Sequence, residues 1–200
     1  FYPIQSLPLS ALTDMGCRFL DGSRLLSRTV TGYSFGTSYL FLVMQSGNHG
    51  HMQLHILIIE AGFYTDIANA QREGAIAALE EEGASYEIIS VPGALEIPGA
   101  IKIASNSNVH FDGYVALGCV IRGETTHYDT VCNESARGLM ALTLDYCLAI
   151  GNGILTVENT EQAWARADKD RLDKGGEAAL AAIAMARLKA DFKANLLSAG

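Results

Sequence analysis

The segment Tyr114-Val-Ala-Leu-Gly-Cys-Val-Ile-Arg-Gly-Glu-Thr-Thr-His127 changes from apolar to polar along its length. Its first part, Tyr114–Val120, contains no charged residue, which is typical of a strand buried on both faces of a parallel sheet. The polar part contains Gly123 and leads into Tyr128–Ala149, a proline-free stretch with the apolar spacing of an amphipathic helix. We therefore expect a central strand, a turn at its carboxyl end and a long helix.

The same alternation continues in both directions from this segment. Runs rich in β-branched residues predict further strands, and runs with apolar residues three or four apart predict helices. The predicted strands are 53–60, 86–91 and 153–157, and the predicted helices are 66–82, 94–105, 160–167 and 175–192. Strands that alternate with helices over short links are parallel. We therefore predict an α/β fold, a three-layer sandwich with a central parallel four-stranded sheet.

Composition excludes several classes of protein. The chain has 200 residues, of which 49% are hydrophobic and 18% are charged, as in a packed globular domain. A net charge of −8 argues against binding to nucleic acid or to an anionic membrane, because both need a basic face. We therefore expect small-molecule substrates, with neither nucleic acid nor membrane as a partner.

Three observations predict a cytoplasmic protein. No apolar run reaches the length of a membrane-spanning helix. No basic segment precedes an apolar stretch with a small-residue cleavage site, so we expect no secretory signal. The cysteines form no C-x-x-C pair and no zinc-type spacing, which favours reduced thiols over disulfides or a metal site. These cysteines are Cys17, Cys119, Cys132 and Cys147.

Residues 1–50 differ in sequence pattern from the rest of the chain. They show no sustained period of strand or helix, so we expect an N-terminal extension with no recognised fold, either disordered or lying on the main domain. The main domain is predicted at 51–200. His49 and His51 lie in the glycine-containing hinge between the two, and we interpret them as linker because no further metal ligands accompany them.

The turn after the central strand is a candidate phosphate site. Ligands of parallel sheets bind beyond the carboxyl ends of the strands, and a helix start offers free N–H groups to an anion. Gly123 allows close approach, and Thr125 and Thr126 add hydroxyl donors, although threonine is also an ordinary helix cap. His127 at the helix start is a candidate proton shuttle, with capping or packing as its alternative.

Two further residues follow other predicted strands. Glu96, in the first turn of a predicted helix, could anchor ligand hydroxyls through its two oxygens or simply complement the helix dipole. Phe63 could stack on a flat heterocycle, although an aromatic residue there more often serves packing.

Four motifs stand out: Val91-Pro-Gly-Ala-Leu-Glu-Ile-Pro98, Leu117-Gly-Cys-Val-Ile-Arg-Gly-Glu-Thr-Thr-His-Tyr128, Val131-Cys-Asn-Glu134, and Ile154-Leu-Thr-Val-Glu-Asn159 followed by Glu161-Gln-Ala163 and Arg166. In order and spacing they resemble the 6,7-dimethyl-8-ribityllumazine synthase family, over residues 54–192. The resemblance implies a flavodoxin-like subunit in a homopentamer, with each active site between two neighbours. It implies condensation of 5-amino-6-(ribitylamino)uracil with 3,4-dihydroxy-2-butanone 4-phosphate, releasing phosphate and water, without cofactor or metal.

The resemblance also implies roles for individual residues. Those expected at the ring and ribityl chain of the uracil substrate are Phe63, Ala94, Leu95, Glu96, Cys119, Val120 and Ile121. Those expected at the phosphate are Gly123, Glu124 and Thr125, with His127 moving protons. Arg166, at the phosphate, and Lys174, near the pyrimidine, would come from the neighbouring subunit.

Three positions depart from the family pattern. Asn152 replaces an aromatic residue at the substrate ring, which weakens the apolar cover there, and Asp170 replaces a second lysine. The turn Asp168–Asp173 lacks the Gly-Thr-Lys-Ala-Gly-Asn type of members that form 60-subunit shells. We therefore expect a pentamer or a pair of pentamers.

Two alternative functions remain for a protein of this fold. A non-catalytic flavin- or lumazine-binding protein is disfavoured because it has no use for His127, Arg166 and the Gly123–Thr125 turn. A protein whose main role is to form a shell is disfavoured by the altered turn at 168–173.

Overall fold

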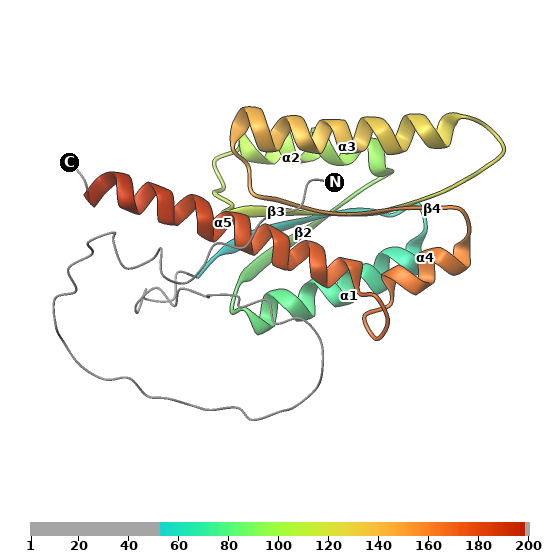
Figure 1. The fold of residues 1–200 in the computed structure, drawn as a ribbon, viewed down its shortest axis with the longest axis horizontal. Coiled ribbons are helices and arrows are strands. Elements are labelled where there is room, and N and C mark those ends of the chain that lie inside the picture. The colour runs from blue at the N-terminus through green and yellow to red at the C-terminus, as the bar shows by residue number, and fades with distance from the viewer. Residues whose placement is uncertain (1–52, 199–200) are drawn as a thin grey trace, which may run out of the picture. The chain divides into compact units, whose positions relative to one another are not determined.

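Four parallel strands form one sheet in the order β2-β1-β3-β4 (Figure 1). The strands are β1 (His55–Ala61), β2 (Ser85–Val91), β3 (Gly113–Ile121) and β4 (Ile150–Val157). This computed structural model describes residues 53–198, so the predicted extension at 1–50, with His49 and His51, lies outside the described residues. The strand order is that of flavodoxin-like sheets, and it confirms the predicted parallel sheet with β3 in its interior.

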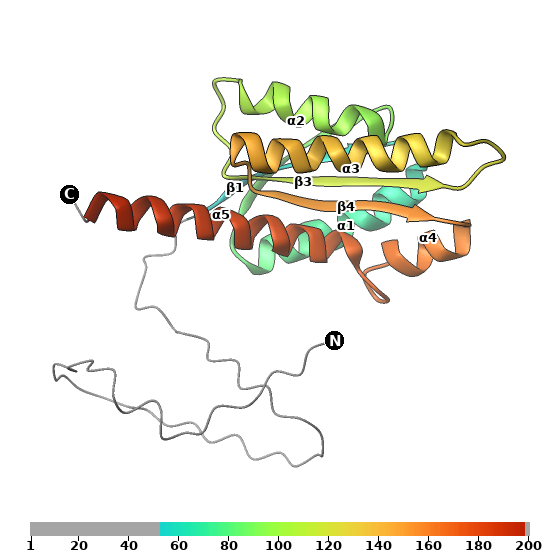
Figure 2. The same cartoon turned by 45° about the horizontal axis from the view of Figure 1, so that its top comes forward.

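Helices cover both faces of the sheet, which confirms the three-layer sandwich (Figures 1 and 2). One face carries α1 (Thr65–Glu81), α4 (Thr160–Ala167) and α5 (Lys174–Ser198). The other carries α2 (Ile97–Ser105) and α3 (His127–Tyr146), with a single 3₁₀ turn, η2 (Ala94–Glu96), before α2. No helix within 53–198 is long and apolar enough to cross a membrane.

Alternation along β1 divides the hydrophobic core between the two faces. Ile56 and Ile58 belong to a cluster with the alanine-rich side of α5 and with Leu79 of α1. Leu57 and Ile59 point the other way, into a cluster with α2 and α3. Because β1 is buried on both sides, its apolar sequence does not alternate with polar residues.

The predicted end of the helix after β3 and the predicted start of β4 were wrong by a few residues. The helix was expected to reach Ala149, but it ends at Tyr146 because Cys147 has a left-handed backbone with φ of 51°. Cys147 donates its backbone N–H to the Leu142 carbonyl and closes the helix. Strand β4 therefore begins at Ile150 rather than at 153.

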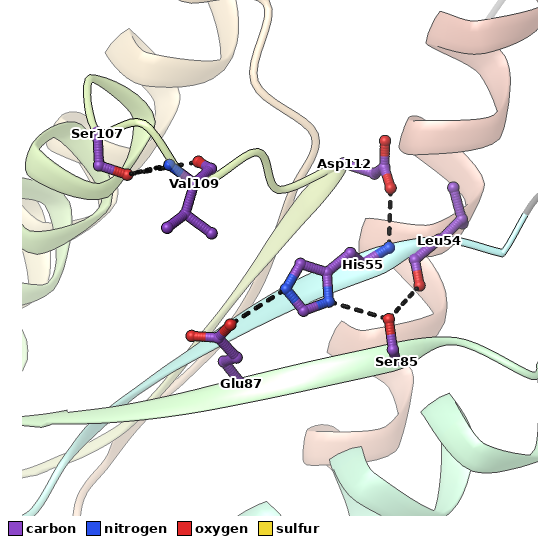
Figure 3. Close-up of polar contacts among 7 residues, drawn as sticks. All are labelled: Leu54, His55, Ser85, Glu87, Ser107, Val109 and Asp112. Atoms are coloured by element: carbon purple, nitrogen blue, oxygen red, sulfur yellow. Dashed lines mark hydrogen bonds and ion pairs between the residues drawn. The ribbon is translucent and has the colours of Figure 1, made fainter.

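Polar side chains hold the amino ends of the strands together (Figure 3). His55 in β1 donates its backbone N–H to Asp112 Oδ2 over 2.8 Å. Its ring nitrogens lie 2.9 Å from Ser85 Oγ and 3.3 Å from Glu87 Oε1, both on β2. Ser107 and Val109 are bonded to each other in the loop before β3. The contacts of His55 tie β2 and the start of β3 to β1 at the end opposite the strand carboxyl ends.

Helix α5 packs against β4 so closely that one position tolerates only glycine. A Cβ atom on Gly151 would overlap the backbone carbonyl of Ala178, which cannot rotate away as a side chain can. We expect Gly151→Ala to lower the free energy of unfolding by about 2 kcal/mol, measured by urea denaturation.

Gly99→Ala is the matched control, because a Cβ atom on Gly99 of α2 meets nothing within 4 Å. It is expected to leave stability unchanged or to raise it by up to about 1 kcal/mol. Equal stability of Gly151→Ala and the wild type would contradict the packing between α5 and β4 described above.

Candidate active site

A cavity of about 320 Å³ lies where β1, β2 and β3 end. Parallel sheets bind ligands at this edge, and the segments that follow these three strands supply the walls. The cavity brings together most of the predicted site residues: Phe63, Ala94, Leu95, Glu96, Cys119, Val120, Ile121, Gly123, Thr125 and His127. Tyr64, Gly93, Tyr128 and Val131 complete the lining.

Phe63 presents an aromatic face to this cavity. Phe63 is 74% exposed, and its ring packs edge-to-face with the Tyr64 ring with 4.9 Å between centroids. The chain is turned here by a backbone bond from the Gly62 N–H to the Val91 carbonyl, which links the ends of β1 and β2. An exposed ring supported at one side can stack on a flat heterocycle.

Glu96 offers a carboxylate to the same cavity from the start of α2. Its backbone N–H donates to the Gly93 carbonyl over 3.2 Å. Its Oε2 lies so near Gly93 that a Cβ atom there would approach it to 3.0 Å. Glycine at position 93 thus leaves room for the carboxylate, which can accept hydrogen bonds from ligand hydroxyls.

The start of α3 is open towards the cavity. Thr126 precedes the helix, yet no side chain caps it. The His127 N–H has only a long contact of 3.4 Å to Thr125 Oγ1. Backbone N–H groups in the first turn of a helix carry the positive end of its dipole, so this start suits an anion such as a phosphate.

His127 is the cavity residue best suited to moving protons. Burial raises the pKa of Cys119 to about 11, so its thiol stays protonated at neutral pH. Desolvation, with a smaller contribution from the hydrogen bond to Cys132, also raises the pKa of Tyr128 above 10.0. The imidazole of His127 is exposed at the cavity mouth and has the chemistry of a proton shuttle.

Four predicted site residues do not line the cavity of their own chain. Glu124 is exposed between two residues that do, and Asn152 Oδ1 accepts from the Ile154 N–H over 3.0 Å. Lys174 pairs with Glu177. Arg166 donates to the Gln162 carbonyl over 3.0 Å, and within residues 53–198 no carboxylate pairs with its guanidinium.

Four cavity residues were not singled out from the sequence. Val131 lies one helical turn after His127, so helical spacing alone could have indicated it. Tyr128 and Gly93 lie within the quoted motifs, but nothing in their residue type indicates that they line the cavity. Tyr64 joins the cavity through the path of the chain after β1, which sequence spacing does not reveal. Within the described residues, no group of three or more His, Cys, Asp or Glu could hold a metal ion.

Comparison with known proteins identifies the family of this chain. The family model described as 6,7-dimethyl-8-ribityllumazine synthase matches residues 53–190. A protein of that name from Sphingopyxis alaskensis is 63% identical over 138 residues, covering 69% of this chain and 96% of the relative. Those from Agrobacterium fabrum and Bartonella henselae are 60% and 59% identical, covering 68% and 70% of this chain and 94% and 91% of the relatives. The chain therefore belongs to the 6,7-dimethyl-8-ribityllumazine synthase family.

Proposed function

We propose that this protein is a transferase of riboflavin biosynthesis that makes 6,7-dimethyl-8-ribityllumazine. It condenses 5-amino-6-(ribitylamino)uracil with 3,4-dihydroxy-2-butanone 4-phosphate and releases phosphate and water. One observation carries the proposal: a single cavity joins an exposed aromatic ring, a carboxylate and an uncapped helix start beside a histidine. Each of these features matches one part of the two substrates.

The uracil substrate fits the side of the cavity built by the ends of β1, β2 and β3. Phe63 stacks on the pyrimidine ring, and the main chain of Cys119 to Ile121 meets the ring edge. The ribityl chain lies along Ala94 and Leu95, where Glu96 accepts hydrogen bonds from its hydroxyls. Asn152 does not line this cavity, so its role at the ring requires a neighbouring subunit.

The phosphorylated substrate fits the start of α3. Gly123, Glu124 and Thr125 form the loop there, and the open N–H groups of the helix bind its phosphate. The 5-amino group of the uracil attacks the ketone and forms an imine with loss of water. Phosphate is then eliminated, and the ribitylamino nitrogen closes the ring with loss of a second water. His127 carries protons between these steps.

The remaining two site residues belong to a neighbouring subunit. Arg166 has no carboxylate partner within 53–198 and does not line its own cavity, which supports a role at the phosphate of the adjacent subunit. Lys174 approaches the pyrimidine in the same way. The exposed apolar side chains of Ile103 in α2 and of Met140 and Leu144 in α3 offer a surface for such a neighbour.

We expect a homopentamer or a dimer of pentamers. Cyclic assembly completes every site, because each needs only one adjacent subunit. The turn at 168–173 contains three aspartates, whose mutual repulsion would disfavour the contacts of a shell, although one of them, Asp173, caps α5 by accepting from the Gly176 N–H. Asp170 stays exposed beside Leu172, which is 49% exposed. Native mass spectrometry will show five or ten subunits, and a dominant species of about 60 subunits would contradict the prediction.

The activity is tested by ultraviolet-visible detection of lumazine formed from the two purified substrates, without added metal or cofactor. Formation of lumazine and of equimolar phosphate supports the proposal. Tight binding of lumazine without turnover would instead favour the non-catalytic binding protein, which the similarity to enzymes across nearly their full length does not favour. We place this catalytic domain at residues 51–200, after an N-terminal extension, and we place the protein in the cytoplasm.

A further inference from the structure

Arg122 lies between two residues that line the cavity, yet it does not line the cavity itself. It directly follows the last residue of β3 and precedes Gly123. Its backbone N–H donates to the Val157 carbonyl over 2.9 Å, which extends the pairing of β3 with β4 by one residue. The Arg122 backbone is therefore fixed at the point where the loop towards α3 begins.

The guanidinium of Arg122 links this point to two other elements. Its Nε donates to Glu158 Oε2, the first residue after β4, over 2.8 Å. Both terminal nitrogens lie 3.4 Å from Asp129 Oδ1 in the first turn of α3. The guanidinium carbon also stands 4.0 Å from the ring centre of Tyr128, which lines the cavity.

The loop between these anchors has few bonds of its own. Residues 123–126 are all exposed, and within the described residues their hydrogen bonds are the long Thr125 contact to the His127 N–H and two bonds to the Thr126 carbonyl. The position of the loop depends on what holds its two ends. Arg122 joins the end of β3, the end of β4 and the start of α3, so its side chain spans the whole loop.

We infer that Arg122 is a positioning residue that holds the phosphate-binding loop and His127 in place through Glu158, Asp129 and Tyr128. This inference rests on the proposed function of the loop. Exposed ion pairs contribute little to global stability, so the effect belongs to the geometry of the site rather than to folding. A displacement of about 1 Å can cost a reaction up to about 10²-fold, so a moderate loss is expected.

The main rival is that Arg122 binds the substrate phosphate directly. The two roles make opposite predictions for Glu158→Ala. If Glu158 orients Arg122, its removal weakens binding of the phosphorylated substrate. If Glu158 merely competes with the phosphate for a binding arginine, its removal leaves that binding unchanged or strengthens it.

The experiment measures kcat and both KM values for Arg122→Gln, Glu158→Ala and the double variant. We expect Arg122→Gln to raise the KM for 3,4-dihydroxy-2-butanone 4-phosphate about tenfold and the KM for the uracil substrate less than about twofold. Glu158→Ala raises the first KM as well, and the double variant is no worse than Arg122→Gln because both act through one contact.

Arg137→Gln is the matched control, since Arg137, like Arg122, pairs with a glutamate. Arg137 and its partner both lie in α3, and the Arg137 side chain is 71% exposed and does not line the cavity. It is expected to behave as the wild type. An active wild type with unchanged KM in Arg122→Gln overturns this inference alone, as does an unchanged or lower KM in Glu158→Ala. Equal rises of both KM values with a lowered melting temperature overturn it in favour of a structural role. A wild type that forms no lumazine overturns the proposed function together with it.

Discussion

Replacing His127 with alanine is expected to slow lumazine formation by about 10²–10⁴-fold, which is the usual contribution of a positioned acid or base. His127 begins α3 at the mouth of the cavity and is exposed, so its side chain contributes little packing. Cys119 cannot replace it, because burial raises the pKa of that thiol to about 11. Steady-state kinetics with both substrates saturating measures the loss in kcat.

Two controls separate this effect from damage to the fold. The thermal unfolding midpoint and the subunit number of His127→Ala are expected to match those of the wild type. Added imidazole is expected to restore part of the rate, because a small base can occupy the space left by the side chain. Wild-type turnover in His127→Ala at neutral pH would rule out the assigned role.

The elements of the fold could be predicted where local chemistry determines their ends. Helix α4 begins and ends as predicted, and Asn159 explains its start because its side chain accepts from the Gln162 N–H. The end of α3 was predicted three residues too late because a cysteine, rather than a glycine, takes the left-handed conformation at position 147. Residue type gives little warning of that, since only glycine adopts it freely.

The residues that line the cavity were predicted more fully than the contacts between segments that are far apart in the sequence. The predicted residues of the cavity lie at the carboxyl ends of strands or directly after them, and parallel strands gather these ends at one edge. The pairing of Arg122 with Glu158 joins positions 36 residues apart, and it depends on β4 lying beside β3. No local pattern shows which charged residue meets which.

Arg166→Ala is expected to raise the KM for the phosphorylated substrate by about 10²-fold, since charge-assisted bonds to phosphate are among the stronger ones. Binding of the uracil substrate is expected to change far less, and Arg166→Lys to recover part of the loss because it keeps the charge without the planar fork. Separate titration of the two substrates measures this difference. Equal losses for both would show that Arg166 does not act at the phosphate.

Mixing two impaired variants tests whether Arg166 acts across a subunit boundary. If each site takes His127 from one subunit and Arg166 from the next, a ring of equal and random His127→Ala and Arg166→Ala subunits contains some intact sites. Each site has an even chance of an intact His127 and an even chance of an intact Arg166, so about one quarter of the sites regain both residues. With the phosphorylated substrate held near the wild-type KM, unfolding and refolding the mixture is therefore expected to restore about a quarter of the wild-type rate, whereas each variant refolded alone keeps its low rate. If both residues served a site within one chain, every site would lack one of them and the refolded mixture would stay as slow as its parents.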